Sequence, residues 1–327
     1  MLAVGLGTLV VPLDSALRVR FDRFLDPVTV VRQSVRITGG TLDANGNPIA
    51  GESFLLPTYD ALERVAIFRP ANGARWLPGV RYTVTLWAPV DRPGGFRAWD
   101  GAALPASVTF SFTSTVVGGA PATEVAPVAA SYCARCDGAI RRPGVSETLA
   151  GSCAHASCHG RDDPGGPAVG LDLGSFDGLR STALGQIAHE TLDGLTETPE
   201  VLPSRFGVSM PVIDPGRPGN SYLFYKILIA DRLWDDAGDD DRFPAQPVGG
   251  SLRPDPAEIA RLRETFVSGE SMPLPLQHDP TRPSPAALDL GRARALQSWI
   301  SAGAPLPGGV EECAPVSCGE DAAGSGG

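Results

Sequence analysis

The sequence predicts two domains of different class, an all-β sandwich followed by a mainly α-helical domain. Residues 1–116 contain short runs in which apolar or β-branched side chains alternate with polar ones, the period of a half-buried strand. Beyond residue 130 the apolar side chains recur at spacings of three and four, which is typical of helices. The intervening residues 117–130 are mostly small residues and prolines and predict a linker. A chain of 327 residues is long enough for two domains of ordinary size.

The first domain is expected to be an immunoglobulin-like (Ig-like) β-sandwich. Turns rich in Asn, Pro and Gly at residues 43–48, 70–73 and 92–95 separate its strands and supply the positive or fixed φ angles that tight turns need. Short strands at this spacing favour the Ig-like fold. The predicted strands are LRVRFDRF, SVRITGG, RVAIFRP, RYTVTLWAP and SVTFSFTST.

Three stretches of this domain carry a resemblance to a known family. VPLDSALRVRFDRFLDPVTV, WLPGVRYTVTL and the closing FSFTST resemble the bacterial Ig-like modules of exported and surface-layer proteins, often called SbsA-type. The resemblance covers essentially all of residues 1–116. It implies a spacer or adhesion module without catalytic residues.

Charge and hydropathy exclude two classes of partner. A formal net charge of -10 argues against nucleic acid, because no basic patch is available to displace counterions from phosphate. No run of about 18 apolar residues occurs, so no membrane-spanning helix is expected. The opening residues read as a first strand because they lack a basic region and a cleavage site. For an exported protein of the periplasm or cell surface, the export signal or lipid anchor is therefore expected upstream of Met1.

The second domain is expected over residues 131–308, followed by a flexible cysteine-containing tail at 309–327. Helix-starting residues precede several of its apolar runs, among them Ser146, Asp255 with Pro256, and Ser284 with Pro285. The predicted helical segments are VSETLAGSCAHA, FDGLRSTALGQIAHETL, NSYLFYKILIADRLW, DPAEIARLRETFV and AALDLGRARALQSWISAGA.

All six cysteines lie in this second half. They form three local pairs: Cys133 with Cys136, Cys153 with Cys158, and Cys313 with Cys318. In an oxidising compartment the first and third pairs predict disulfides, and bonds within each pair are favoured. Bonds crossed between the two pairs would instead staple the ends of the domain. A zinc site built from the four thiolates of the first two pairs is the alternative, but the second knuckle is wide and exported thiols oxidise.

The stretch GSCAHASCHG, residues 151–160, predicts a c-type haem attachment site. Such a site needs two thiols and a histidine directly after the second, which Cys153, Cys158 and His159 provide. Four residues lie between the two cysteines, whereas two is usual in such a site. A thioether on the opposite face of the iron would raise its potential, and Met272 in SGESMPLPLQ and Met210 are the two candidates. The choice of Met272, with Met210 in reserve, follows from a family resemblance.

A second resemblance supports this interpretation. CHG, GLDLGS, DPGRPGNSYLFYKI, SGESMPLP and LQSWISAGAP occur in the order seen in planctomycete and myxobacterial cytochrome c-like domains, over residues 143–306. The resemblance implies one covalent haem c at Cys153 and Cys158, axial ligands His159 and Met272, and Trp299 and Tyr222 packed near the haem. The wide cysteine spacing departs from the family's common motif.

The sequence thus predicts an exported c-type cytochrome that carries an Ig-like spacer or adhesion module and passes electrons to a redox partner protein. Catalysis is not expected, since no Ser/His/Asp constellation or phosphate loop is evident and Met272 would close the distal site of a peroxidase. The alternative prediction is a non-haem, disulfide-stabilised structural or adhesive protein of the cell surface.

Overall fold

The computed structural model describes most of the two predicted domains. The residues described are 9–13, 15–42, 48–50, 57–69, 76–91, 94–115, 130–137, 139–154, 159–160, 167, 170–188, 210–234, 253–269, 271–273, 288–308 and 313–318, with the backbone alone at 40–42 and 48–50. Two compact units are distinguished: Met1–Ala126 with Asp241–Phe266, and Pro127–Asp240 with Val267–Gly327. The chain therefore passes from one unit to the other three times.

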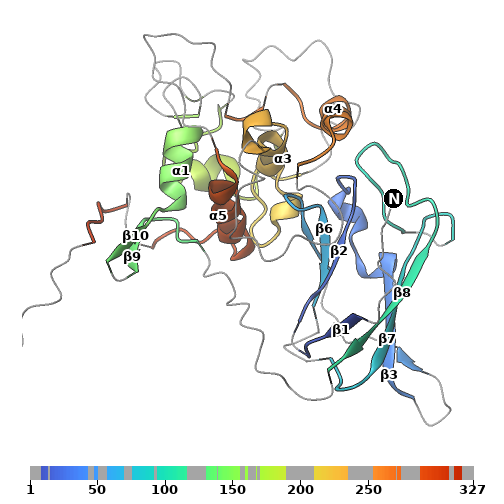
Figure 1. Cartoon of the computed structure of the whole chain (residues 1–327). Coiled ribbons are helices and arrows are strands. Elements are labelled where there is room, and N and C mark those ends of the chain that lie inside the picture. The colour runs from blue at the N-terminus through green and yellow to red at the C-terminus, as the bar shows by residue number, and fades with distance from the viewer. Residues whose placement is uncertain are drawn as a thin grey trace, which may run out of the picture. The chain divides into compact units, whose positions relative to one another are not determined.

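The first unit contains two small sheets (Figure 1). The five-stranded sheet has the order β1 (Leu9–Val11), β8 (Val108–Ser114), β7 (Arg81–Leu86), β3 (Val35–Leu42) and β4 (Pro48–Ala50). Strand β1 pairs parallel to β8, and the other pairs are antiparallel. The three-stranded sheet has the antiparallel order β2 (Leu17–Arg20), β6 (Val65–Phe68) and β5 (Thr58–Asp60).

Alternation along the strands separates a buried face from an exposed one. In β7, Tyr82, Val84 and Leu86 are buried, whereas Arg81 is exposed and the threonines between them are half-buried. This follows from the two-residue period of a strand. The buried ring of Tyr82 stacks on Phe112 of β8 with centroids 5.1 Å apart, so the sheet's inner face forms an aromatic core.

A helix from the second half of the sequence completes the first unit. Helix α4 (Pro256–Thr265) begins at Asp255, whose side chain accepts a hydrogen bond from the amide of Ala257. It buries Leu262, and Phe266 at its end stacks on Trp99 with ring centroids 3.8 Å apart. The apolar face of α4 is thus covered by residues of the first unit.

The second unit combines short helices with a β-hairpin. Helix α1 (Val145–Ser152) packs against α5 (Leu290–Ser301), and β9 (Arg135–Asp137) pairs with β10 (Ile140–Arg142). The remaining elements are short: α2 (Phe176–Gly178), the π-helical turn η5 (Leu179–Ala183), η6 (Pro218–Asn220), α3 (Tyr222–Leu228) and η7 (Asp231–Trp234).

The predicted fold class, an all-β Ig-like sandwich beside a mainly α cytochrome c-like domain, is wrong. The described residues form a mixed α/β structure with small sheets, in which neither an Ig sandwich nor a helical cytochrome domain is evident. Helix α4 enters the first unit, and the 3₁₀ turns η1 (Pro27–Thr29) and η2 (Arg32–Ser34) follow β2. Frequent glycine and proline, 39 and 31 residues, keep most other elements short.

Candidate functional site

The segment 151–160 begins in α1 and turns back at Cys153 and His159. The amide of His159 donates a hydrogen bond to the carbonyl of Cys153 at 3.1 Å, and its carbonyl accepts one from Leu173 at 2.9 Å. Both side chains are buried, with 5% and 6% of their surface exposed. The structure therefore brings Cys153 and His159 together, while Cys158, the second expected attachment point, lies outside the described residues.

Met272, the expected distal ligand, lies beside α3. Its amide donates a hydrogen bond to the carbonyl of Lys226 at 2.9 Å, and its side chain is half-buried. Met210, the reserve ligand, is buried, and its carbonyl accepts a hydrogen bond from Ala188 at 3.0 Å. In the described part of the chain, no hydrogen bond or ion pair joins Met272 to His159.

The expected metal chemistry is not supported by this arrangement. Among the residues that the structure describes, no group of three or more His, Cys, Asp or Glu side chains is placed to hold a metal ion. The four-thiolate zinc alternative is also wrong, because Cys133 and Cys136 form disulfides. These findings overturn the prediction of a metal-binding protein, and the described residues give no support to haem, iron or electron transfer.

The stretch DPGRPGNSY, part of the expected haem signature, builds a hydrogen-bonded turn ahead of α3. The amide of Asp214 donates to the hydroxyl of Ser221 at 2.8 Å, and the amide group of Asn220 donates to the Asp214 carboxylate at 2.6 Å. The buried hydroxyl of Tyr225 donates to the carbonyl of Gly219 at 2.8 Å. The polar groups of this motif thus satisfy one another, which is the usual state of buried polar groups.

Two aromatic residues expected near a haem have structural partners. The hydroxyl of Tyr222 accepts a hydrogen bond from the amide of Ser268 at 3.0 Å, and burial raises its pKa to about 12 although this bond opposes the shift. The indole of Trp299 is fully buried and donates to the carbonyl of Pro305 at 2.9 Å. Trp299 is therefore part of the core of the second unit, whereas Tyr222 is half-buried.

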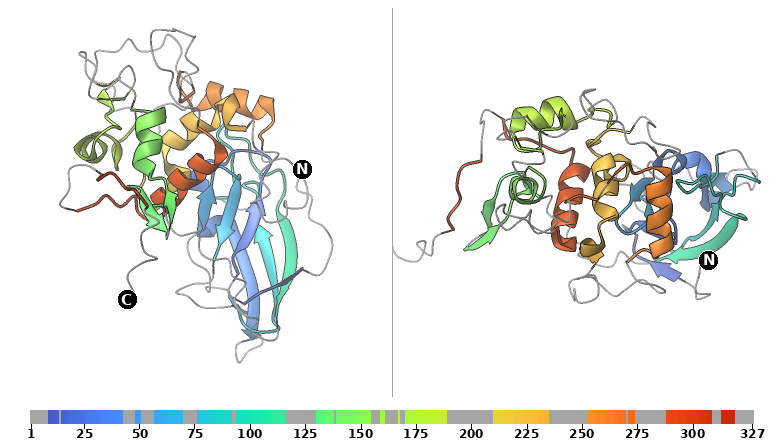
Figure 2. Two further views of the ribbon diagram at one scale, coloured as in Figure 1. Left: turned by 60° about the vertical axis from the view of Figure 1, so that its left-hand side comes forward. Right: turned by 90° about the horizontal axis from the view of Figure 1, so that it is seen from above.

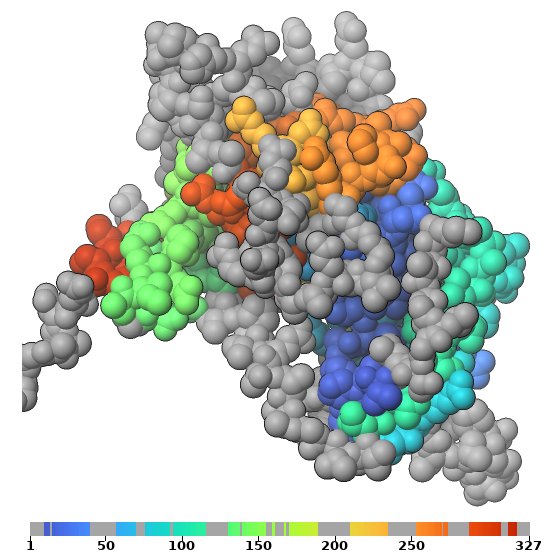
Figure 3. Space-filling model, in the orientation of Figure 1, coloured from blue at the N-terminus to red at the C-terminus, as the bar shows by residue number. Residues whose placement is uncertain are grey.

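The other four predicted cysteines form two disulfides. Cys133 is bonded to Cys313 and Cys136 to Cys318, with Cα atoms 5.4 and 5.5 Å apart. We call this assembly the cysteine clasp: Cys133, the hairpin Arg135–Arg142 and the segment Cys313–Cys318. The hairpin and the segment lie side by side in both views of Figure 2, and Figure 3 shows them together at the surface of the second unit.

The connectivity is crossed, whereas bonds within each local pair were favoured. Cys136 lies in strand β9, and Cys133 lies in the bend before this strand. The segment from Cys313 to Cys318 has no helical turn to bring its ends together. Each cysteine therefore finds its partner across the clasp, 180 and 182 residues away in the sequence.

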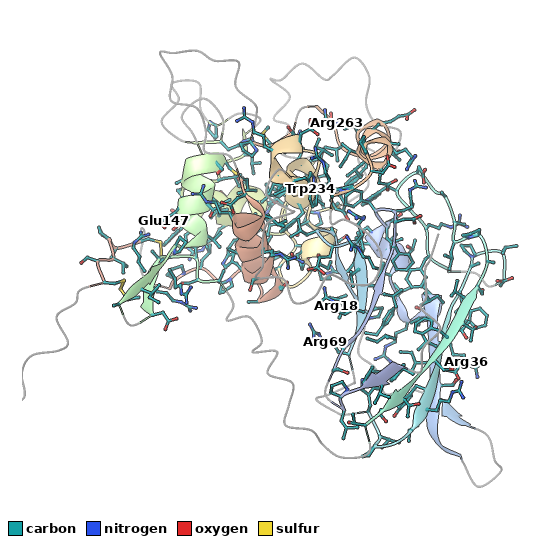
Figure 4. The ribbon with its side chains drawn as sticks, in the orientation of Figure 1. Arg18, Arg36, Arg69, Glu147, Trp234 and Arg263 are labelled. Atoms are coloured by element: carbon teal, nitrogen blue, oxygen red, sulfur yellow. A yellow bond between two sulfur atoms is a disulfide. The ribbon has the colours of Figure 1, made fainter. Side chains whose placement is uncertain are left out.

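Polar contacts tie the clasp to the start of α1. The guanidinium of Arg141 in β10 forms an ion pair with Glu147, labelled in Figure 4, and its Nε donates to the carbonyl of Val316 at 3.3 Å. The hydrogen bond and negative charge of Glu147 raise the pKa of Arg141. The Ser146 hydroxyl lies 3.5 Å from the sulfur of Cys313. One arginine thus bridges the hairpin, the helix and the C-terminal segment.

A second polar centre, in the first unit, was not anticipated from the sequence. The carboxylate of Glu258 in α4 is buried and accepts hydrogen bonds from the Phe24 amide at 2.8 Å and from Arg23 Nε at 2.5 Å. Arg23 also pairs with Asp100 at 2.6 Å. Burial opposes the charged form of Arg23, but the carboxylates of Asp100 and Glu258 outweigh this effect and raise the pKa of Arg23. The only sequence signal was a glutamate in the first turn of a predicted helix.

The surroundings of Glu258 contain further buried polar groups. The hydroxyl of Tyr59 accepts a hydrogen bond from the amide of Leu25 at 2.9 Å, and burial raises the pKa of Tyr59. The guanidinium of Arg64 lies 5.6 Å from the centroid of the Phe24 ring, within reach of a cation–π interaction. Burial lowers the pKa of Arg64. This centre fixes α4 in place.

None of the helices in the described part of the chain combines the length and the apolar character needed to cross a membrane. Disulfides form and persist in oxidising compartments, so the two bonds of the clasp indicate an extracytoplasmic protein.

Comparison with known proteins gives little further guidance. No family model matches the chain, and no curated protein matches it. Among solved structures it is similar to the N-terminal part of the bacterial S-layer protein SbsC, with 16% identity over 33% of this chain and 23% of that chain and a TM-score of 0.24. Two longer structures of SbsC match equally, over 32% and 33% of this chain and 13% of theirs. The match thus spans less than a quarter of the S-layer chains, and a likeness of this size carries no assignment.

Proposed function

We propose that the protein is a non-haem, disulfide-stabilised structural or adhesive protein that works in the periplasm or at the cell surface. The observation that carries this proposal is the cysteine clasp, whose two disulfides join segments 180 and 182 residues apart. In a reducing cytoplasm these four cysteines would remain reduced thiols. In this account the described chemistry serves to hold a shape.

The clasp secures the ends of the second unit. Its hairpin immediately precedes α1, and its C-terminal segment follows α5, which packs against α1. The two disulfides therefore join the chain before α1 to the chain after α5. A crosslink of this kind restricts the unfolded chain more strongly the longer the loop it closes. A unit built from short helices and loops gains most from such a constraint.

The first unit supplies the surface that adhesion or spacing requires. It has its own core, two sheets and a helix held by Glu258. Stable β-rich modules of this kind present exposed strand faces to a partner. The redox partner and the single covalent haem c that the sequence predicts form no part of this proposal.

The proposal is tested on the whole chain, exported with an added signal in a bacterial host that matures c-type cytochromes. Intact mass and the reduced absorption spectrum are measured on the purified protein. The expected result is a polypeptide mass lowered only by the hydrogens lost to disulfides, with no haem absorption. A Cys153→Ala, Cys158→Ala variant is the control, and it should differ only by the substituted side chains.

Two results would overturn the proposal. A mass increase of one haem with a sharp reduced α band, lost in the control variant, would restore the electron-transfer interpretation. Fully reduced Cys133, Cys136, Cys313 and Cys318 in the exported protein would remove the clasp on which the proposal depends.

A further inference from the structure

The outer face of the five-stranded sheet carries a regular array of hydroxyl groups. In β7, Thr83 and Thr85 alternate with buried residues, and the register places Thr83 between Thr38 and Ser111, and Thr85 opposite Thr109. We call this surface the hydroxyl face; its members are Thr38, Thr83, Thr85, Thr109, Ser111 and Thr113. Residues of one strand that share a face stand about 7 Å apart, and neighbouring strands about 4.8 Å apart, so the array is a flat grid.

Neighbouring hydroxyls on this face lie within hydrogen-bonding distance of each other. Thr83 Oγ1 lies 3.3 Å from Ser111 Oγ, and Thr85 Oγ1 lies 3.1 Å from Thr109 Oγ1. Each hydroxyl has one donor and two acceptor positions, so such a pair retains capacity for a ligand. Threonine also favours exposed strands for its shape alone, and the hydroxyls by themselves therefore indicate no partner.

Two arginines give the hydroxyl face a positive charge. Arg36 of β3 stands opposite Thr85, and Arg81 of β7 stands opposite Thr113. Both are exposed, and neither forms a hydrogen bond or ion pair with any residue that the structure describes. Four residues along the strands and one strand across separate them, which places their Cα atoms about 14 Å apart.

The described strands of this face carry arginines but no carboxylates. Elsewhere in the first unit, Arg18 is paired with Glu63 and Arg23 with Asp100. None of the described residues of β3, β7 and β8 is acidic, although the whole chain has a net charge of -10. Unpaired guanidinium groups are well suited to bind carboxylates through two parallel hydrogen bonds.

We propose that the hydroxyl face binds an acidic polysaccharide, with Arg36 and Arg81 contacting separated carboxylates and the threonines contacting sugar hydroxyls. Sugar hydroxyls both donate and accept hydrogen bonds, as do those of Ser and Thr. A protein partner would need large apolar or aromatic anchors, and nucleic acid a denser positive charge. The inference deepens the adhesive role proposed above and rests on it.

Binding is measured on the whole, disulfide-intact chain by isothermal titration at low ionic strength, with polygalacturonate as the acidic probe and dextran as the neutral one. The test variants are Arg36→Gln, Arg81→Gln, their combination, and the Thr83→Val, Thr85→Val pair. Arg69→Gln is the matched control, because Arg69 is an exposed arginine just beyond β6 of the other sheet (Figure 4). Gel filtration and thermal melting confirm that each variant is folded.

The expected result is binding to polygalacturonate, weakened about fivefold by each arginine substitution and more by their combination, as for single exposed charge pairs. The Thr83→Val, Thr85→Val variant should also bind polygalacturonate more weakly than the unsubstituted chain. The control Arg69→Gln should leave the affinity unchanged. Equal binding of dextran, equal loss in Arg69→Gln, or no binding at all would overturn the inference. The intact mass of the same sample distinguishes this failure from a failure of the proposed function. If the chain is disulfide-bonded and haem-free but does not bind polygalacturonate, only the inference is contradicted.

Discussion

The carboxylate of Glu258 accepts a hydrogen bond from the main-chain nitrogen of Phe24 at 2.8 Å, although 234 residues separate the two in the sequence. The same carboxylate binds Arg23 and Arg261, so one buried side chain joins α4 to the residues that follow β2. A buried carboxylate is stable only with such partners. The relationship explains why a helix from the C-terminal half belongs to the first unit.

Glu258→Ala should destabilise the first unit by about 3 kcal/mol, because it leaves the Phe24 amide without its acceptor and Arg23 without one of its two carboxylates. Urea unfolding gives the change in free energy, and hydrogen exchange over Pro256–Thr265 shows whether α4 opens locally. Glu264→Ala is the control, since Glu264 is exposed on the same helix and should change stability by less than about 0.5 kcal/mol. Equal effects of the two substitutions would refute the role of Glu258.

Removing one of the two disulfides should lower the free energy of unfolding less than removing the remaining one afterwards. Either bond alone closes a loop of about 180 residues, worth about 5 kcal/mol of unfolded-chain entropy, while the second adds only a small ring worth about 2.5 kcal/mol. Replacing Cys133 and Cys313 by alanine, or Cys136 and Cys318, should therefore cost about 2.5 kcal/mol each, and replacing all four about 7.5 kcal/mol.

The measurement is denaturant unfolding of the two paired variants and the fourfold variant. Their free energies should be strongly non-additive, with the fourfold loss exceeding the sum of the paired losses. Simple additivity would show that the two bonds stabilise different parts of the unit and that the entropic account of the clasp is wrong.

Gly144→Ala should destabilise the second unit by about 2 kcal/mol through overpacking. A Cβ at this position would lie 2.5 Å from Ala134 N and from the carbonyl oxygen of Tyr132, and the backbone there already receives the first amides of α1. Thermal melting of the variant measures the loss. Gly308→Ala is the control, because a Cβ there meets nothing within 4 Å, and a similar loss in both would contradict the steric argument.

Stability should fall between pH 10 and pH 12 partly because of Tyr132. Burial, with a smaller contribution from the charge of Asp172, raises the pKa of Tyr132 to about 12, whereas the unfolded chain releases this proton near pH 10. The contribution is therefore complete below pH 10 and is lost as the pH rises toward 12. Tyr132→Phe should flatten the dependence of the urea midpoint on pH in this window.

Tyr222→Phe provides the contrast for this experiment. The pKa of Tyr222 is also raised to about 12, but the Tyr222 hydroxyl accepts a hydrogen bond from the amide of Ser268. Tyr222→Phe removes this acceptor and should therefore lose stability at neutral pH as well. If Tyr132→Phe leaves the alkaline slope unchanged, burial of this phenol does not contribute to the pH dependence.

Local structure was predictable where a period was clear. The five alternating runs contain β2, β6, β7 and β8 and most of β3, and four predicted segments contain α1, α3, α4 and α5. Period two and period three-to-four identify which side chains of an element share a face. They do not identify the partner that covers this face, which is why α4 was assigned to the wrong neighbours and the fold class was wrong.

The site was less predictable than the elements. Four cysteines could be named as disulfide partners, but spacing along the chain does not determine connectivity, and the bonds are crossed where proximity in sequence favoured local ones. Glu258 gave no signal beyond its place in the first turn of a predicted helix, because its partners Arg23 and Phe24 lie more than 230 residues earlier. Long-range pairing of this kind is fixed by tertiary packing alone.

The most direct test of the account is a non-reduced tryptic map of the exported chain. Trypsin cleaves after Arg135, between Cys133 and Cys136, and after Arg294, which leaves Cys313 and Cys318 in one C-terminal peptide. The clasp predicts a single species in which the peptides of Cys133 and Cys136 are both bonded to the C-terminal peptide. A Cys133–Cys136 species that lacks the C-terminal peptide would contradict the clasp and the function proposed from it.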